Sequence, residues 1–123
     1  MKNRILKTAA LMCLVSFLMQ SRAMAHAFLD RAEPRVGSVV PAAPKEVKIW
    51  FTQEPEHAFS SIQVFDANGK QIDKADTRTD PNDDKVLIVS LPDVGPGTYR
   101  VVWHVLSIDA HRTQGEFKFT VKQ

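Results

Sequence analysis

Apolar and polar residues alternate one by one along several separate stretches of this chain. A period of two places every second side chain on the same face of an extended strand, so each stretch is predicted to be a β-strand with one buried face. The clearest example is residues 98–107, where Tyr99, Val101 and Trp103 fall on one face. The expected strands are residues 27–31, 45–51, 60–66, 86–91, 98–107 and 116–121.

Turn signals separate these stretches, and no helical period follows residue 25. The Asn68-Gly69 pair predicts a hairpin turn. Prolines interrupt the segment between the first two expected strands, which excludes a central strand there. Residues 73–84 are polar without a period and are predicted to be a solvated loop. About seven short strands in roughly a hundred residues indicate one all-β domain, an immunoglobulin-like β-sandwich or a Greek-key β-barrel.

The first 25 residues have the pattern of a secretory leader. Lys2, Arg4 and Lys7 precede an apolar run at residues 9–19, and small residues at Ala23 and Ala25 form a cleavage site. The run is shorter than the about 20 residues of a transmembrane helix, although an uncleaved anchor is the alternative. We therefore predict a cleaved signal peptide at residues 1–25 and a mature domain at residues 26–123. Such a protein is exported, into the periplasm in a Gram-negative bacterium.

Removing the leader changes the chemistry available to the domain. The whole chain has 16 Lys and Arg against 14 Asp and Glu, and the leader holds four of the basic residues and no acidic one. The net charge thus changes from +2 to −2, and no basic face for nucleic acid is expected. Cys13 and all four methionines also lie in the leader. The domain therefore has no disulfide and no sulfur ligand, which favours metal ions that bind nitrogen and oxygen.

Cleavage after Ala25 makes His26 the first residue of the mature chain. A terminal histidine offers its α-amine and its imidazole Nδ1 to one metal ion. Asp109 and His111 follow the longest strand and are two residues apart, so extended backbone would point both side chains the same way. A plain hydrogen-bonded pair is the alternative. Together the three residues offer three nitrogens and one oxygen, a set that suits one tetragonal Cu(II) ion.

The mature sequence resembles the CopC family of periplasmic copper-binding and copper resistance proteins. The resemblance covers nearly all of it and is carried by residues 26–29 (HAFL), 47–51 (VKIWF), 99–111 (YRVVWHVLSIDAH) and 115–119 (GEFKF). It implies a small β-barrel or sandwich holding Cu(II) through a histidine brace, here His26, Asp109 and His111. It also implies copper resistance or uptake, often beside a CopD-type inner-membrane protein, by binding and handing over the ion without catalysis. We expect a monomer.

Three departures from the family pattern concern the site. Ala110 stands where the family commonly has glycine, and a Cβ disfavours positive φ there. Gln53 and Glu54 replace a region where many members carry a glutamate near the copper, and both are left out of the ligand set. Some members have a methionine-rich Cu(I) loop, and its absence here predicts that no Cu(I) site exists.

The remaining polar residues are weaker candidates. His57, next to Glu56, is either a secondary copper ligand or a solvated loop residue, and His104 is a supporting or core residue. Ser107 lies near the Asp-x-His pair, but a hydrolytic triad would leave no room for copper ligation by His111. Tyr99 and Trp103 are expected in the core.

Two rival functions remain open at this level. A histidine brace also activates oxygen in oxidative copper enzymes, but the anionic ligand Asp109 fills an open position and a broad substrate face is not evident. A metal-free β-sandwich interaction module is the second rival. It would tolerate an added residue before His26, whereas a brace would not.

Overall fold

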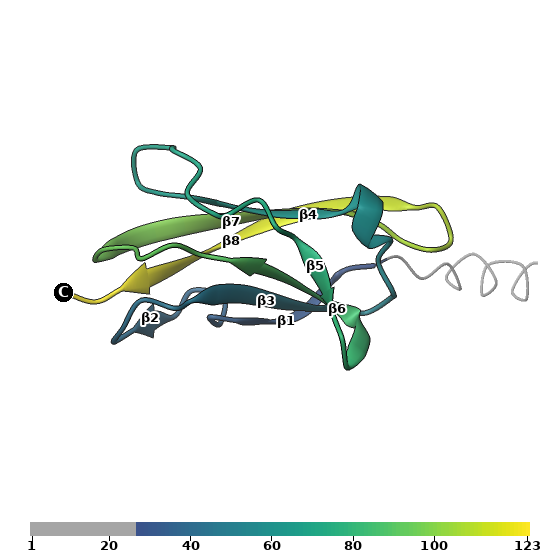
Figure 1. The fold of residues 1–123 in the computed structure, drawn as a ribbon, viewed down its shortest axis with the longest axis horizontal. Helices are drawn as coiled ribbons and strands as arrows, with labels where there is room; N and C mark the ends of the chain where they lie inside the picture. Colours follow the sequence, from purple (N-terminus) through teal and green to yellow (C-terminus); the bar gives the residue numbers. More distant parts are fainter. Residues whose placement is uncertain (1–26) are drawn as a thin grey trace, which may run out of the picture.

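The computed structural model describes residues 27–123, which form two four-stranded sheets packed face to face (Figure 1). One sheet has the order β1-β3-β6-β5 and the other β2-β8-β7-β4. The elements are β1 Leu29–Glu33, β2 Val39–Val40, β3 Glu46–Phe51, the 3-10 helix η1 His57–Phe59, β4 Ser61–Phe65, β5 Arg78–Asp80, β6 Asp83–Ser90, β7 Gly97–Leu106 and β8 Arg112–Val121. The predicted all-β sandwich is confirmed.

The alternating residues form the core between the sheets. Buried and partly buried residues alternate strictly along β3, and Tyr99, Val101, Trp103 and Val105 are the buried residues of β7. The rings of Phe51 and Trp103 meet edge to face with centroids 5.3 Å apart, which joins the two sheets. The predicted core positions of Tyr99 and Trp103 are therefore confirmed.

The prediction of a solvated loop at residues 73–84 is wrong in part. The segment contains β5 and the start of β6. β5 is a sheet edge that pairs through its backbone and buries none of its side chains fully, so it has no apolar period. Asp73 Oδ1 accepts the Val64 N–H at 2.8 Å and Thr77 Oγ1 accepts the Ile62 N–H at 3.1 Å. These side chains cover backbone donors of β4, an edge strand that would otherwise be open to pairing.

Four segments meet at one end of the sandwich. The described chain begins there, and Phe28 and Thr52 exchange hydrogen bonds. The loop that follows Thr52 is joined to the β7–β8 turn, because Ile108 N–H donates to the Glu54 carbonyl at 3.2 Å. Glu54 also lines a hollow with residues 81–85. In Figure 1 this is the end at which the grey trace joins the fold.

Gly115 of β8 is required by the packing of Trp103. A Cβ at this position would lie 2.5 Å from the Trp103 indole, which is closer than van der Waals contact permits. We expect Gly115→Ala to lower the free energy of unfolding by about 1 to 3 kcal/mol, as overpacked cores do. Gly95→Ala is the matched control, since its Cβ would meet nothing within 4 Å. Urea denaturation of both variants measures the difference, and equal stabilities would contradict the packing argument.

Candidate metal site

Asp109 and His111 lie in the turn between β7 and β8. Asp109 Oδ1 and His111 Nδ1 are 3.3 Å apart, so the structure brings the two predicted side chains together. The extended backbone that the sequence analysis expected to align these side chains is wrong. Ala110 between them has φ +68°, so the backbone is a left-handed turn and not an extended strand. The turn itself aligns the carboxylate with the imidazole.

The buried hydroxyl of Ser107 organises this turn. Ser107 is 1% exposed, and its hydroxyl donates a hydrogen bond to Asp109 Oδ1. The His111 N–H donates to Ser107 Oγ at 3.3 Å, and the Ser107 N–H donates to the His111 carbonyl at 2.9 Å. The bond from Ser107 lowers the pKa of the Asp109 carboxyl below its ordinary value, and His111 lowers it further. The turn therefore presents an ionised carboxylate next to an imidazole.

The beginning of the described chain is tied to the same region. Ala27 is fully buried, and its carbonyl accepts a hydrogen bond from the hydroxyl of Thr113 in β8. Phe28 N–H donates to Thr52 Oγ1 at 3.0 Å, and Thr52 N–H donates back to the Phe28 carbonyl at 2.8 Å. Thr113 is two residues from His111, so the chain begins beside the turn. His26, the third predicted ligand, lies outside the described residues.

The described residues supply two candidate ligands, one oxygen and one nitrogen. Within residues 27–123, no group of three or more His, Cys, Asp or Glu side chains could hold a metal ion. Asp109 and His111 alone would form only part of a coordination sphere, because Cu(II) prefers a tetragonal set of nitrogen and oxygen ligands.

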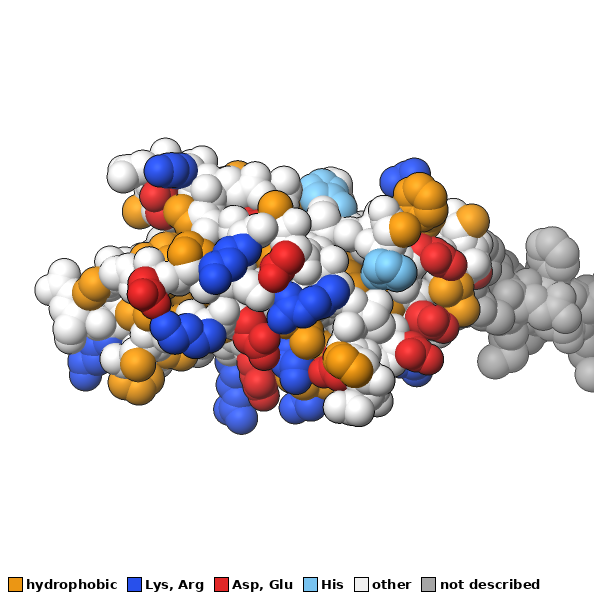
Figure 2. All heavy atoms as spheres, viewed as in Figure 1, with side chains coloured by type: hydrophobic (Ala, Val, Ile, Leu, Met, Phe, Trp, Pro, Cys, Tyr) orange, Lys and Arg blue, Asp and Glu red, His pale blue; other side chains and the backbone are white. Residues whose placement is uncertain are grey.

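Negative charge is concentrated around the candidate site. Figure 2 shows acidic side chains gathered at the end of the molecule next to the grey atoms. The loops that meet there, residues 52–59, 81–85 and 107–112, contain five acidic residues and two basic ones: Glu54, Glu56, Asp83, Asp84 and Asp109 against Lys85 and Arg112. The remaining described segments hold nine acidic and ten basic residues. This asymmetry favours the approach of a cation to this end.

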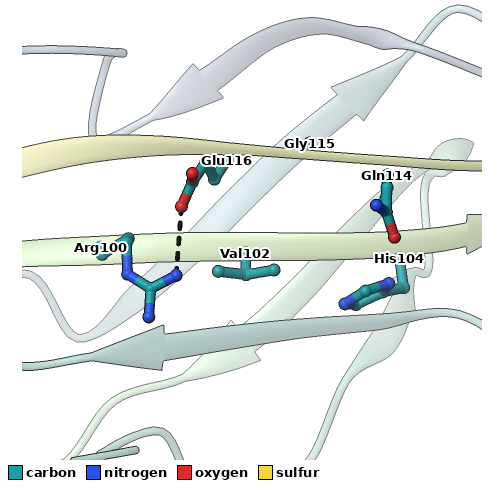
Figure 3. A pocket seen from close by; sticks show the side chains of 6 residues that line it. All are labelled: Arg100, Val102, His104, Gln114, Gly115 and Glu116. Atoms are coloured by element: carbon teal, nitrogen blue, oxygen red, sulfur yellow. Dashed lines mark hydrogen bonds and ion pairs between the residues drawn. The ribbon is translucent and has the colours of Figure 1, made fainter. Parts of the chain in front are cut away.

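The other histidines lie apart from the core. His104 is exposed on the outer face of β7 and lines a shallow hollow with Arg100, Gln114 and Glu116 (Figure 3), where Arg100 and Glu116 form an ion pair of 3.1 Å. A core position for His104 is therefore wrong. His57 is exposed in η1. Gln53 and Glu54 are half-buried, and the Glu54 main chain contacts the β7–β8 turn through Ile108.

Sequence reasoning missed the role of two hydroxyl groups. Ser107 was considered only as a nucleophile, although a serine two residues before an aspartate at the end of a strand is typical of a turn closed by side chains. Thr113 offered no such signal. Its partner Ala27 is 86 residues away in the chain, and only the fold brings the two together.

The positive φ of Ala110 leads to a stability prediction. A residue with a Cβ in the left-handed region costs about 1 to 2 kcal/mol, whereas glycine adopts it freely at an entropic cost of about 0.5 to 1 kcal/mol. We expect Ala110→Gly to match or exceed the parent in free energy of unfolding. Ala58→Gly in η1, where φ is not positive, should lose about 0.5 to 1 kcal/mol. Thermal and urea unfolding test this, and a comparable loss at both positions would contradict it.

Comparison with known proteins identifies the family to which this fold belongs. The CopC domain family model matches residues 29–122. Protein YobA of Escherichia coli is 36% identical over 114 residues, covering 92% of each chain. Copper resistance protein C of Escherichia coli is 30% identical, covering 98% of this chain and 97% of that protein.

A solved structure agrees with the sequence matches. The crystal structure of CopC from Methylosinus trichosporium OB3b superimposes with a TM-score of 0.74 at 35% identity, covering 79% of this chain and 94% of that one. The family model and both relatives span most of the sequence, and the structure shares its two-sheet architecture. The chain therefore belongs to the CopC domain family.

Proposed function

We propose that this protein is an exported Cu(II)-binding protein that sequesters or delivers copper through a histidine brace made by His26, Asp109 and His111. The observation that carries the proposal is the 3.3 Å pairing of Asp109 Oδ1 with His111 Nδ1 at the end of the sandwich where the described chain begins. The copper resistance protein among the relatives supports a copper-related role.

Covalent geometry supports the participation of His26. His26 is joined directly to Ala27, and consecutive Cα atoms are about 3.8 Å apart. Ala27 is buried and bonded to Thr113, two residues from His111. A leader cleaved after Ala25 would free the α-amine of His26 at this point. The amine and imidazole of one residue would then complete the partial set supplied by the turn.

The ligand chemistry favours Cu(II) over Cu(I). Two imidazoles, one amine and one ionised carboxylate form a nitrogen and oxygen set for which Cu(II) has the highest affinity in the divalent series. Cu(I) prefers sulfur, and residues 26–123 contain neither cysteine nor methionine. One Cu(II) ion per mature chain is the expected stoichiometry.

Carriage of copper suits this site better than oxidative catalysis. Asp109 would occupy a coordination position that an oxygen-activating site keeps open.

Among residues 27–123, no helix is long and apolar enough to cross a membrane. With the leader at residues 1–25, we place the mature protein in the periplasm as a monomer. A CopD-type inner-membrane protein is the partner that the family resemblance suggests.

The decisive experiment is a Cu(II) titration followed by electron paramagnetic resonance on two proteins. One begins at His26 with a free α-amine, and in the other the α-amine of His26 is acetylated. We expect only the first to bind one equivalent tightly with an axial, nitrogen-rich spectrum, because acetylation removes the amine as a ligand without adding another one. His111→Ala and Asp109→Ala should both weaken binding, His111→Ala more. Equal binding by both proteins would refute the brace, and no binding by either would favour a metal-free module.

Copper affinity should fall in acid, because an amine or imidazole nitrogen binds Cu(II) only when unprotonated. Below about pH 6 we expect the apparent Kd to rise by at least about tenfold per pH unit, the effect of one competing proton. The lowered pKa of Asp109 keeps its carboxylate ionised in this range, so the loss comes from the nitrogens. Competition titrations at several pH values measure it. A constant Kd between about pH 5 and 8 would contradict nitrogen ligation.

A further inference from the structure

We infer that Ser107 is a positioning residue of the proposed copper site, whose hydroxyl holds the Asp109 carboxylate and the His111 backbone in the arrangement that binds Cu(II). The inference rests on the proposed function for the identity of the ion. Its geometry rests on the described residues alone.

Ser107 is held in place by contacts within the fold. It is 1% exposed. Ser107 and Ser60 are the two buried polar residues among residues 27–123. It follows the last residue of β7 and pairs with Pro55 of the neighbouring loop in an isolated β-bridge. Its N–H donates to the His111 carbonyl at 2.9 Å. Because its backbone contacts both the Pro55 loop and His111, the Ser107 side chain has a defined position beneath the turn.

The single hydroxyl of Ser107 contacts both candidate ligand residues. It has one proton, which it donates to Asp109 Oδ1, and it accepts the N–H of His111 at 3.3 Å. The hydroxyl also lies 3.1 Å from the His111 carbonyl oxygen. A short relay thus runs from the His111 amide through Ser107 to the Asp109 carboxylate. The relay couples the orientation of one ligand to the backbone position of the other.

The Asp109 side chain needs such support. It is 50% exposed, so packing restrains its rotamer only on one side. The turn also passes through the left-handed conformation of Ala110, which a residue with a Cβ adopts only when its surroundings impose it. Loss of the hydroxyl would release the carboxylate and loosen the turn. Groups that orient metal ligands typically change metal affinity by about 10 to 100-fold when they are removed.

The test compares Ser107→Ala with Ser60→Ala in the mature protein that begins at His26. Ser60 is a matched control, because it is also buried and its hydroxyl accepts the Leu106 N–H at 3.1 Å without contacting the turn ligands. We expect Ser107→Ala to raise the Kd for Cu(II) by about tenfold or more and to alter the copper hyperfine splitting. Ser60→Ala should lower stability but leave the Kd and the spectrum unchanged.

A second pair of variants separates the hydroxyl from packing. Ser107→Thr and Ser107→Val have the same shape, so any steric strain is common to both, but only threonine keeps the hydroxyl. The threonine variant should bind Cu(II) more tightly than the valine variant and with a spectrum closer to that of the parent. This pair decides the matter if Ser107→Ala does not fold.

The outcomes distinguish this inference from the proposed function. If the parent protein does not bind Cu(II), the proposed function fails. If the parent binds through its N-terminus but Ser107→Ala keeps the Kd within about twofold and the same spectrum, the function stands and the positioning role is refuted. Identical behaviour of the threonine and valine variants would refute it as well.

Discussion

The pairing of β7 with β8 is the constraint on which the rest of the structure depends. The two ten-residue strands are hydrogen-bonded along their whole length, from Gly97 opposite Val121 to Leu106 opposite Arg112. Their inner faces contribute Trp103 and Phe119 to the core, and the absence of a side chain at Gly115 makes room for the indole. Because the ladder runs unbroken to Leu106 and Arg112, the turn between them is anchored at both ends. That turn carries the candidate ligands.

Hydroxyl groups then convert a sheet end into a candidate binding site. Ser107 closes the turn, and Thr113 and Thr52 hold the first described residues against the same end. Each contact joins a short side chain to a backbone group or a carboxylate, so little conformational entropy is lost when it forms. The excess of acidic residues in the surrounding loops adds an attractive field for cations. The hydrogen-bonded loops and the excess of acidic residues thus lie at the same end of the sandwich, where the described chain begins.

Individual strands and residues show which features of the structure the sequence pattern predicted and which it did not. The alternation in β3 and β7 predicted both strands and their buried faces, because burial of one face imposes a period of two. β5 was missed because an edge strand pairs through its backbone and needs no apolar period. For His104 the core alternative is wrong, and the alternation itself indicates this, because His104 falls on the face of β7 opposite the buried residues. The side-by-side placement of Asp109 and His111 was predicted on an extended backbone, although a left-handed turn produces it.

The sequence by itself determined the all-β class, the strands with one apolar face, the lack of sulfur in residues 26–123 and the spacing of Asp109 and His111. These properties depend on composition and on neighbours within a few residues, so no tertiary information is needed to find them. Only the tertiary structure decided that Ser107 is buried beneath the turn and that Thr113 holds Ala27. The latter contact crosses 86 positions of sequence. Such contacts arise because the two sheets bury their apolar faces together, which brings distant loops to one end of the sandwich.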